Sequence, residues 1–469
     1  MAARRASRTI RNLIIFGVLA SLLVALALVE RSSAPSTGKT VAAANFTHSV
    51  NASIVPGTQS DEEQEVSLSG DGTISFTHVT SEFDSVVVRA KGITCEAKKP
   101  RLTLYVDGVS YGSEYAVGGS WDDYKYHTRL IEADAHDIVL EYESSSSSAS
   151  CEEPIKVSLL TFLDPSPVAV GNYVAGFPGR WPGTAQALND FSTKTGRDPA
   201  FVTWYQDWVG DSGFVPQHFA LLEGRTITPM LSWSPSNLSK YGKSVRQPEY
   251  SLSKIASGDW DAYIRRTGRG MRNYGKPVYL RFAHEMNGDW YPWGVGVNGN
   301  RPGDYVAAWR HVHDIFEQEG ATNVRWVWSP NAKTELASYE SLYPGDKYVD
   351  WVAIDGYNWT TANRGGWRSF SQIFASSYDE MTKLTSKPVM IGETASAEAS
   401  TGPSGPTSKA SWIEDAYLSA LPARFPQVKA ILWFSVDYDR DWRVDSSPES
   451  LKTYKRVIDK PKYNGTLPP

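Results

Sequence analysis

The chain has 469 residues, too many for one ordinary domain, and its 41% hydrophobic and 21% charged residues are typical of a globular protein. Its net charge is −5 and no basic block follows the first dozen residues, so nucleic acid is not expected as a partner. The 17 Trp and 24 Tyr favour a ligand with flat apolar faces, although about half of these rings are expected in the core.

The first residues predict a targeting segment. Four arginines within the first 11 residues precede an uncharged apolar run, 13–29, which is typical of a secretory signal. Because this run is close to the minimum length for a membrane span, and Pro35 disfavours cleavage after the small residues that precede it, an uncleaved anchor over 1–34 is the alternative. Either reading places the rest of the chain outside the cytoplasm, secreted or anchored at the cell surface. Residues 35–62 are predicted to form a flexible tether.

Residues 63–164 are predicted to form a β-sandwich module. Short apolar runs such as 101–106 alternate with turn signals such as Asp107-Gly108, and no helical period interrupts them. Two prolines within residues 164–167 predict a short, stiff connector at the end of the module.

Cys95 and Cys151 are the two cysteines of the sequence, and both lie in this module. An exported chain with a single pair most simply forms one disulfide, which would stabilise the module by roughly 4 kcal/mol in the chain-entropy model. A free buried pair is the alternative. The spacing of the cysteines does not fit a zinc site.

The order of several motifs in the module resembles that of calcium-dependent xylan-binding modules of the β-sandwich kind. The motifs are Cys95 after a strand, Asp107-Gly108, Trp121-Asp-Asp-Tyr124, Ala135-His136 and Cys151-Glu152. The resemblance implies sugar binding and a structural calcium ion, which needs a cage of oxygen ligands. Four acidic residues could supply part of that cage, and a charged, solvated rim is the alternative reading of them: Asp122, Asp123, Glu152 and Glu153.

From residue 168 to about 460, apolar runs alternate with helical stretches such as 304–319, which Gly320 ends. Eight strand–helix repeats predict an α/β fold, a (β/α)8 TIM barrel. An open doubly wound sheet is the alternative, but residues 171–179 lack its glycine-rich first turn. The eight predicted strands are 168–173, 200–204, 226–233, 277–282, 324–328, 351–354, 388–391 and 430–434.

Two carboxyl groups end predicted strands: Glu285 ends the fourth and Glu393 the seventh. The carboxyl ends of barrel strands meet at one mouth, so both side chains are expected there. A retaining glycosidase needs two such carboxyls about 5–5.5 Å apart, and aromatic rings near Glu285 could stack on sugar faces. A structural Glu285 paired with Arg281 is the alternative. The sequence has neither the Gly-x-Ser-x-Gly elbow of serine hydrolases nor the second His of a zinc protease.

The motifs at these strand ends resemble those of glycoside hydrolase family 26, whose members are (β/α)8 retaining endo-glycanases that include β-mannanases and mixed-linkage β-glucanases. The resemblance implies Glu285 as acid/base, Glu393 as nucleophile, Tyr357 in contact with the nucleophile and His284 beside the acid. It requires no cofactor or catalytic metal. The matching motifs are Arg281–Gly294, Trp328–Asn331, Ile354–Asn358 and Ile391–Thr394.

The same resemblance implies that Trp433 is the aromatic platform under the sugar at the cleavage point and that Trp290 is a wall of the neighbouring subsite. Other strand-end residues complete the predicted substrate contacts: Trp233, Trp293, Tyr205, Asn358 and Arg281.

The expected substrate is a β-linked polysaccharide, with β-1,4-mannan favoured and mixed-linkage β-glucan close behind. Many mannanases of the family carry His directly after the Trp of strand three, where this chain has Ser234, so the sequence departs from the mannanase pattern. A barrel that has lost catalysis and only binds polysaccharide is a further alternative. The protein is expected to be a monomer, with membrane contact only through the N-terminal segment.

Overall fold

The protein is described from a computed structural model, which splits into two compact units that are treated separately below. No helix among the described residues is long and apolar enough to cross a membrane. The N-terminal apolar run lies outside the described residues, so its role as signal or anchor stays a prediction. The described residues are 38–57, 64–79, 82–92, 101–115, 120–143, 154–179, 184–211, 213–240, 245–332, 336–361, 365–399 and 405–469.

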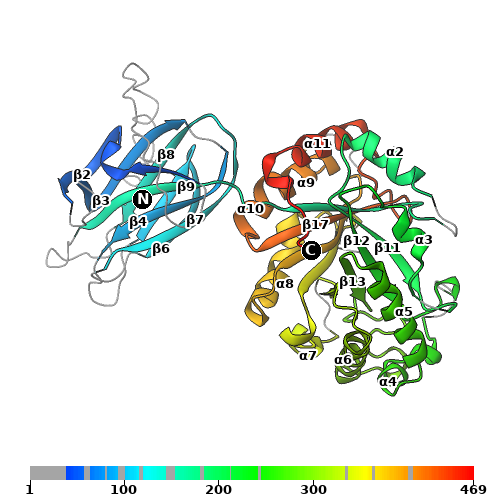
Figure 1. Ribbon diagram of the computed structural model, residues 1–469. Helices are drawn as coiled ribbons and strands as arrows, with labels where there is room; N and C mark the ends of the chain where they lie inside the picture. Colours follow the sequence, from blue (N-terminus) through cyan, green and yellow to red (C-terminus); the bar gives the residue numbers. More distant parts are fainter. Residues whose placement is uncertain are drawn as a thin grey trace. The chain divides into compact units, whose positions relative to one another are not determined.

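The N-terminal module is an antiparallel β structure, as predicted (Figure 1). The long strand β3 pairs with β9 through its first half and with β8 through its second half, and Gly70 and Asp71, both at positive φ, lie between the halves. The hydrogen-bonded order is β6-β5-β8-β3-β9-β4-β7, with β1 on β9 and β2 on β3. The strands are β1 (Gly38–Ala42), β2 (His48–Pro56), β3 (Gln64–Val79), β4 (Phe83–Lys91), β5 (Arg101–Val106), β6 (Val109–Tyr115), β7 (Asp122–Ile131), β8 (Ala135–Glu143) and β9 (Ile155–Leu163).

The module begins earlier in the chain than predicted. The tether expected over 35–62 is wrong for residues 38–56, which form β1, the 3-10 turn η1 (Ala43–Asn45) and β2. Val41 and Ala43 are buried because β1 pairs with β9, so even small apolar side chains contribute to the core there. The polar composition of this stretch concealed a strand that is stabilised by backbone pairing.

Two predictions about the module fall on residues that are not described. Cys95 and Cys151 lie outside the described residues, as do Glu152 and Glu153 of the proposed calcium cage. Of the other two acidic residues, Asp123 pairs with Arg89 at 3.1 Å. Within the described part of the chain, no group of three or more His, Cys, Asp or Glu is placed to hold a metal ion. The disulfide and the calcium ion stay predictions.

The C-terminal unit is a closed barrel of eight parallel strands in chain order, which confirms the predicted (β/α)8 fold (Figure 1). The helix predicted over 304–319 is α6, and Gly320 follows it at φ +75°. The strands are β10 (Ala169–Val174), β11 (Phe201–Asp207), β12 (Thr228–Ser234), β13 (Val278–Phe282), β14 (Val324–Trp328), β15 (Trp351–Asn358), β16 (Val389–Ser396) and β17 (Val428–Ser435).

Helices and short turns surround these strands and connect them. The α-helices are α2 (Gln186–Thr195), α3 (Pro216–Ala220), α4 (Leu252–Ala256), α5 (Asp261–Tyr274), α6 (Pro302–Gln318), α7 (Tyr339–Leu342), α8 (Phe370–Leu384), α9 (Lys409–Glu414), α10 (Leu421–Arg424) and α11 (Pro448–Ile458). The remaining turns are η3 (Leu238–Lys240), η4 (Pro248–Tyr250), η5 (Val297–Gly299), η6 (Asp346–Tyr348), the π-helical η8 (Asp415–Ala420) and η9 (Pro461–Tyr463).

Alternate residues of the barrel strands belong to two separate apolar clusters. One contains Phe201, Met230 and Tyr279, and the other contains residues of the surrounding helices such as Trp309. Because successive side chains of a strand point to opposite faces, the first cluster fills the barrel interior. From these interior positions, every second residue toward the end of a regular strand also faces the interior.

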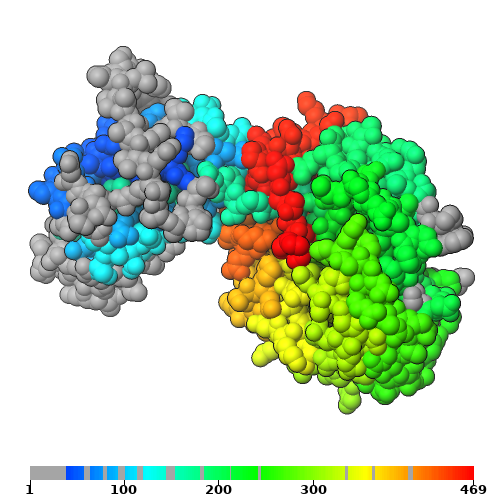
Figure 2. All heavy atoms as spheres, in the orientation of Figure 1, coloured from blue at the N-terminus to red at the C-terminus, as the bar shows by residue number. Residues whose placement is uncertain are grey.

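The C-terminal segment crosses one end of the barrel (Figure 2, red). Leu467 joins the interior cluster, and the Tyr279 hydroxyl donates to the Pro468 carbonyl at 2.7 Å. The barrel domain therefore continues beyond the predicted end at residue 460, and its last residues cover the interior at the amino ends of the strands.

Candidate active site

Polar side chains replace the apolar interior at the carboxyl ends of the strands. Two residues beyond Tyr279 the interior position is Arg281, and four beyond Phe201 it is Tyr205. The same count puts Ser232 of β12 and Asp355 of β15 inside. The register of the closed barrel thus collects one cation, one carboxyl and several hydroxyls at a single mouth.

Glu393 faces this mouth because β16 contains an irregularity. Ile354 pairs with Ile391 but the next residue, Asp355, pairs with Glu393, so Gly392 is an extra residue in β16. A Cβ atom on Gly392 would lie 2.5 Å from Asp355 Oδ1 and 2.8 Å from Ser329 Oγ. Glycine is therefore required here, since any side chain would displace the carboxyl or the hydroxyl beside it.

Glu393 is held by three donors. The Arg281 guanidinium donates to Oε1 at 2.5 Å, where the Tyr205 hydroxyl also donates, and the Tyr357 hydroxyl donates to Oε2 at 2.5 Å. Burial and the charge of Glu393 raise the pKa of both tyrosines well above its usual value, so they stay protonated and donate. Glu393 is 5% exposed, and both of its oxygens are fixed in place.

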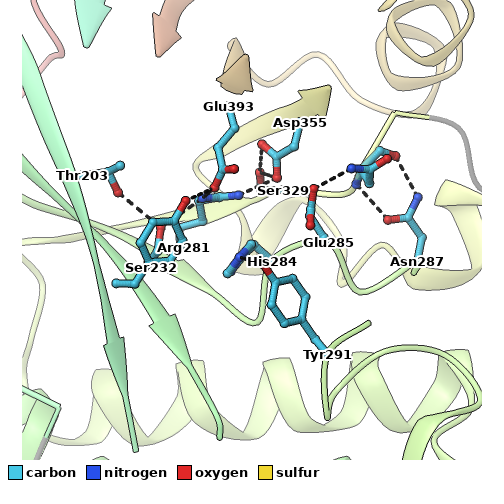
Figure 3. A network of polar contacts seen from close by, with 12 residues as sticks. Thr203, Ser232, Arg281, His284, Glu285, Asn287, Tyr291, Ser329, Asp355 and Glu393 are labelled. Atoms are coloured by element: carbon cyan, nitrogen blue, oxygen red, sulfur yellow. Dashed lines mark hydrogen bonds and ion pairs between the residues drawn. The ribbon is translucent and has the colours of Figure 1, made fainter. Parts of the chain in front are cut away.

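Arg281 joins Glu393 to a second buried carboxyl. Its other terminal nitrogen donates to Asp355 Oδ2 at 2.5 Å, and Ser329 Oγ lies 3.0 Å from both Asp355 oxygens. Although burial alone lowers the pKa of Arg281, Asp355 and Glu393 raise it well above its usual value, so the guanidinium stays charged. In the view of Figure 3, Asp355 and Ser329 lie between Glu393 and Glu285.

Glu285 lies on the loop that follows β13, in an unusual backbone conformation. Ala283 and Glu285 have φ of +45° and +52°, a left-handed region that costs non-glycine residues of order 1–3 kcal/mol each. The Glu285 amide donates to the Ser329 carbonyl at 2.7 Å, and Gly288 closes a turn on the Glu285 carbonyl at 3.0 Å. The first bond ties the strained loop to the end of β14, and the second closes a turn within the loop.

The carboxyl of Glu285 accepts two neutral N–H groups, Asn331 Nδ2 on Oε1 at 2.5 Å and Trp290 Nε1 on Oε2 at 2.7 Å. Asn331 is itself fixed by two bonds to Asn287: its backbone N–H donates to Asn287 Oδ1 at 2.8 Å, and its carbonyl accepts from Asn287 Nδ2 at 2.8 Å. Burial, followed by the charge of Glu393, raises the pKa of Glu285 to about 7. Near neutral pH this carboxyl therefore carries a proton in a large fraction of molecules.

His284 lies directly before the acid and is 1% exposed. Burial, with Arg281 acting in the same direction, lowers its pKa well below the usual value, so the imidazole is neutral. Its Nε2 is 3.3 Å from the Tyr291 hydroxyl, and its ring lies 5.6 Å from that of Tyr205. A neutral ring keeps further positive charge away from the two carboxyls.

Comparison with known proteins agrees with this geometry. A Glycosyl hydrolase family 26 profile matches residues 239–395, which include Glu285 and Glu393. Endoglucanase H of Acetivibrio thermocellus is 37% identical over 314 residues, covering 65% of this chain and 32% of that protein. The barrel is a family 26 glycoside hydrolase domain.

Other relatives of the family 26 domain carry different activities in their names. A mannan endo-1,4-beta-mannosidase of Bacillus subtilis is 30% identical over 190 residues, covering 39% of this chain and 44% of its own. Beta-1,3-xylanase TXYA of a Vibrio species is 25% identical over 284 residues, covering 55% and 56%. The chain spans from about a third to just over half of the length of these three curated relatives.

Several predicted substrate contacts of the family 26 domain are wrong. Trp233 and Trp433 are 0% exposed and occupy outward positions of β12 and β17, where Trp233 packs on Trp208 and Trp433 on Trp412. Their neighbours on the strands face the interior instead, because side chains alternate.

Trp293 and Asn358 are buried as well, so they too are wrong as substrate contacts. The Trp293 indole donates to the His284 carbonyl at 2.6 Å and its ring stacks on Tyr291. The Asn358 amide donates to Ser396 and accepts from the Arg368 N–H. Both residues support the site from behind. Trp290, at 36% exposure, is the one of the four predicted tryptophans that remains open to a ligand.

Three polar residues of the site were not assigned a role from sequence: Asn331, Asp355 and Ser329. Each lies at or just after a strand end within a motif that matches the family, and each has a short polar side chain in an otherwise apolar run. Position at a strand end was therefore an available signal for all three.

Proposed function

We propose that the protein is a retaining endo-β-glycanase that hydrolyses polysaccharide by double displacement. The observation that supports this most directly is the difference between the two carboxyls at one mouth. Glu393 accepts from a guanidinium and two tyrosine hydroxyls, whereas Glu285 accepts from two neutral N–H groups and has its pKa raised to about 7. One group suits a nucleophile and the other a proton donor.

In the first step Glu285 gives its proton to the glycosidic oxygen while Glu393 attacks the anomeric carbon. The bond to the departing sugar breaks and an ester bond to Glu393 forms. In the second step Glu285, now ionised, removes a proton from water, whose oxygen attacks the anomeric carbon and releases Glu393. Tyr205, Tyr357 and Arg281 hold Glu393 throughout.

For the substrate we propose a β-glucan with β-1,4 linkages, with β-mannan as the second candidate. The similarity to Endoglucanase H is higher in identity and longer than that to the mannanase of Bacillus subtilis. Ser234 also stands where many mannanases of the family have His. Ser234 is 1% exposed, so it can act on a sugar only through its immediate neighbours. The mannanase similarity itself supports mannan.

The test is a substrate panel with the full chain: mixed-linkage β-glucan, β-1,4-mannan and, as a control, β-1,3-xylan. We expect reducing-sugar release from mixed-linkage β-glucan, with internal cleavage and an initial product of retained anomeric configuration by NMR. Higher kcat/KM on mannan would replace the glucanase proposal by the mannanase one. Tight binding to all three without turnover would refute hydrolysis and favour a polysaccharide-binding protein.

A further inference from the structure

The segment 436–447, which follows β17, places an aromatic ring behind the nucleophile. We call it the Trp442 segment. The Trp442 ring is 2% exposed and lies 5.1 Å from the Tyr357 ring and 5.0 Å from the Trp359 ring, measured between centroids. Because the Tyr357 hydroxyl donates to Glu393 Oε2 at 2.5 Å, the position of Trp442 determines the direction of that donor. Trp442 thus acts on Glu393 through one intervening ring.

The Trp442 segment has no helix or long strand of its own, so its shape depends on other contacts. A single buried cation supplies three of them. Lys409, the first residue of α9, directs Nζ at the Asp441 carbonyl at 2.7 Å, the Arg443 carbonyl at 2.9 Å and Ser446 Oγ at 2.6 Å. The two carbonyls are those on either side of Trp442, which fixes the backbone from which the ring projects.

Ser446 connects Lys409 to the carboxyl group of Glu398. Ser446 accepts from Lys409 and donates to Glu398 Oε1 at 2.7 Å, and Ser447 and Ser450 donate to the same oxygen at 2.9 and 2.8 Å. Lys409 is 0% exposed. Burial lowers its pKa to about 8, whereas Glu398 and Asp441 act in the opposite direction, so the ammonium is charged at neutral pH. All three ammonium protons have an acceptor in the segment.

We propose that Lys409 is a positioning residue for catalysis: it holds the Trp442 segment so that Trp442 keeps Tyr357 directed at Glu393. This inference rests on the proposed function for its effect on rate. Neither Lys409 nor Trp442 is open to a substrate, so neither contributes directly to sugar binding. Loss of the Lys409 ammonium group should therefore lower kcat and leave KM nearly unchanged, since the sugar contacts persist while the nucleophile loses a fixed donor.

The experiment compares wild type with Lys409→Met, which keeps an unbranched side chain one atom shorter and removes the donors. We expect kcat to fall about tenfold on the best glycan of the panel, with KM changed less than about twofold. Amide hydrogen exchange should become faster over residues 436–447 and stay unchanged over β13. Lys194→Met is the matched control, because Lys194 reaches the same segment through an exposed ion pair with Asp445 at 2.5 Å, and it should alter neither readout.

A double-mutant cycle tests the path through Tyr357. Tyr357→Phe removes the hydroxyl and keeps the ring, so adding Lys409→Met to it should cost little more, whereas an independent effect would multiply. Multiplying effects, or a Lys409→Met enzyme with wild-type kcat, would overturn the proposal. If wild type hydrolyses none of the glycans, the proposed function fails, and the exchange measurement still decides whether Lys409 holds the segment.

Discussion

The two carboxyls of the site share one mouth and differ in almost every contact. Glu393 lies on a strand, in register with Asp355, and accepts from one cation and two hydroxyls. Glu285 lies on a loop in left-handed backbone and accepts from an amide and an indole, with no cation among the described residues in direct contact. The comparison teaches that chemically equal side chains are assigned opposite roles by their donors: charge-bearing donors favour the ionised form, and burial among neutral donors favours the protonated one.

Removing the nucleophile should have the largest effect. We expect Glu393→Ala to lose at least about 10⁴-fold in kcat, because no other group can form the intermediate. Added azide should restore turnover of an activated aryl glycoside and give a product of inverted configuration, since azide attacks from the side of the missing carboxyl. The anomer is identified by NMR. A product of retained configuration would exchange the roles assigned to Glu393 and Glu285.

Loss of the Glu285 proton, by rising pH or by mutation, should have a smaller effect on activity than removal of the nucleophile. Because the protonated form is the active one and its pKa is raised to about 7, kcat/KM should fall as pH rises through about 7. Glu285→Ala should lose roughly 10²–10⁴-fold on polysaccharide and lose this alkaline limb when assayed on an aryl glycoside that needs no acid. A limb that persists in Glu285→Ala would show that another group causes it.

Arg281 forms an ion pair with Glu393, which Glu285 does not share. Loss of Arg281 should destabilise the fold. Arg281→Met leaves Glu393 and Asp355 buried without their cation, which should cost about 3–5 kcal/mol in the free energy of unfolding by urea. Arg456→Met is the control, because Arg456 pairs with Glu414 where both side chains are about half exposed, and should cost under about 1 kcal/mol. Equal costs for the two variants would contradict the role of the buried ion pair.

The smallest expected effect on activity comes from losing the Trp290 indole N–H that donates to Glu285. Trp290→Phe keeps a ring and removes the N–H that donates to Oε2, a bond that lowers the pKa of Glu285. The alkaline limb should therefore move upward, by less than about one pH unit, since a hydrogen bond contributes about 1 kcal/mol. Trp367→Phe is the control, because the Trp367 indole N–H has no acceptor among the described residues. A downward shift in Trp290→Phe would contradict the assignment.

The sequence predicted which segments meet at the mouth better than it predicted which side chains enter it. All eight barrel strands were predicted to start within two residues of their observed starts, because apolar runs between helical repeats identify buried parallel strands, but β15 and β16 continue four and five residues beyond their predicted ends. Glu285, Glu393, Arg281 and Tyr357 were assigned to the mouth and lie there, with contacts that join them.

The errors at Trp233 and Trp433 have one cause. Both end a strand and both are large rings, but a one-residue difference in position decides whether a side chain faces the interior or the helices. That parity follows from the closed register of eight strands, which a run of apolar residues does not reveal. Ser232 and Phe434, their neighbours, take the interior positions. Similarly, residues 38–56 look like a tether by composition, and long-range pairing makes them strands.

Because Gly392 is an extra residue in β16, the bulge that it forms decides whether the Glu393 side chain faces the mouth of the barrel. If residues 390–393 alternated strictly, with no bulge, Gly392 would face the interior and Glu393 would face the helices. Deleting Gly392 alone would keep Glu393 on the interior face, two positions after Met390, whereas one further residue inserted before Glu393 would turn the carboxyl toward the helices while leaving every catalytic group in the gene.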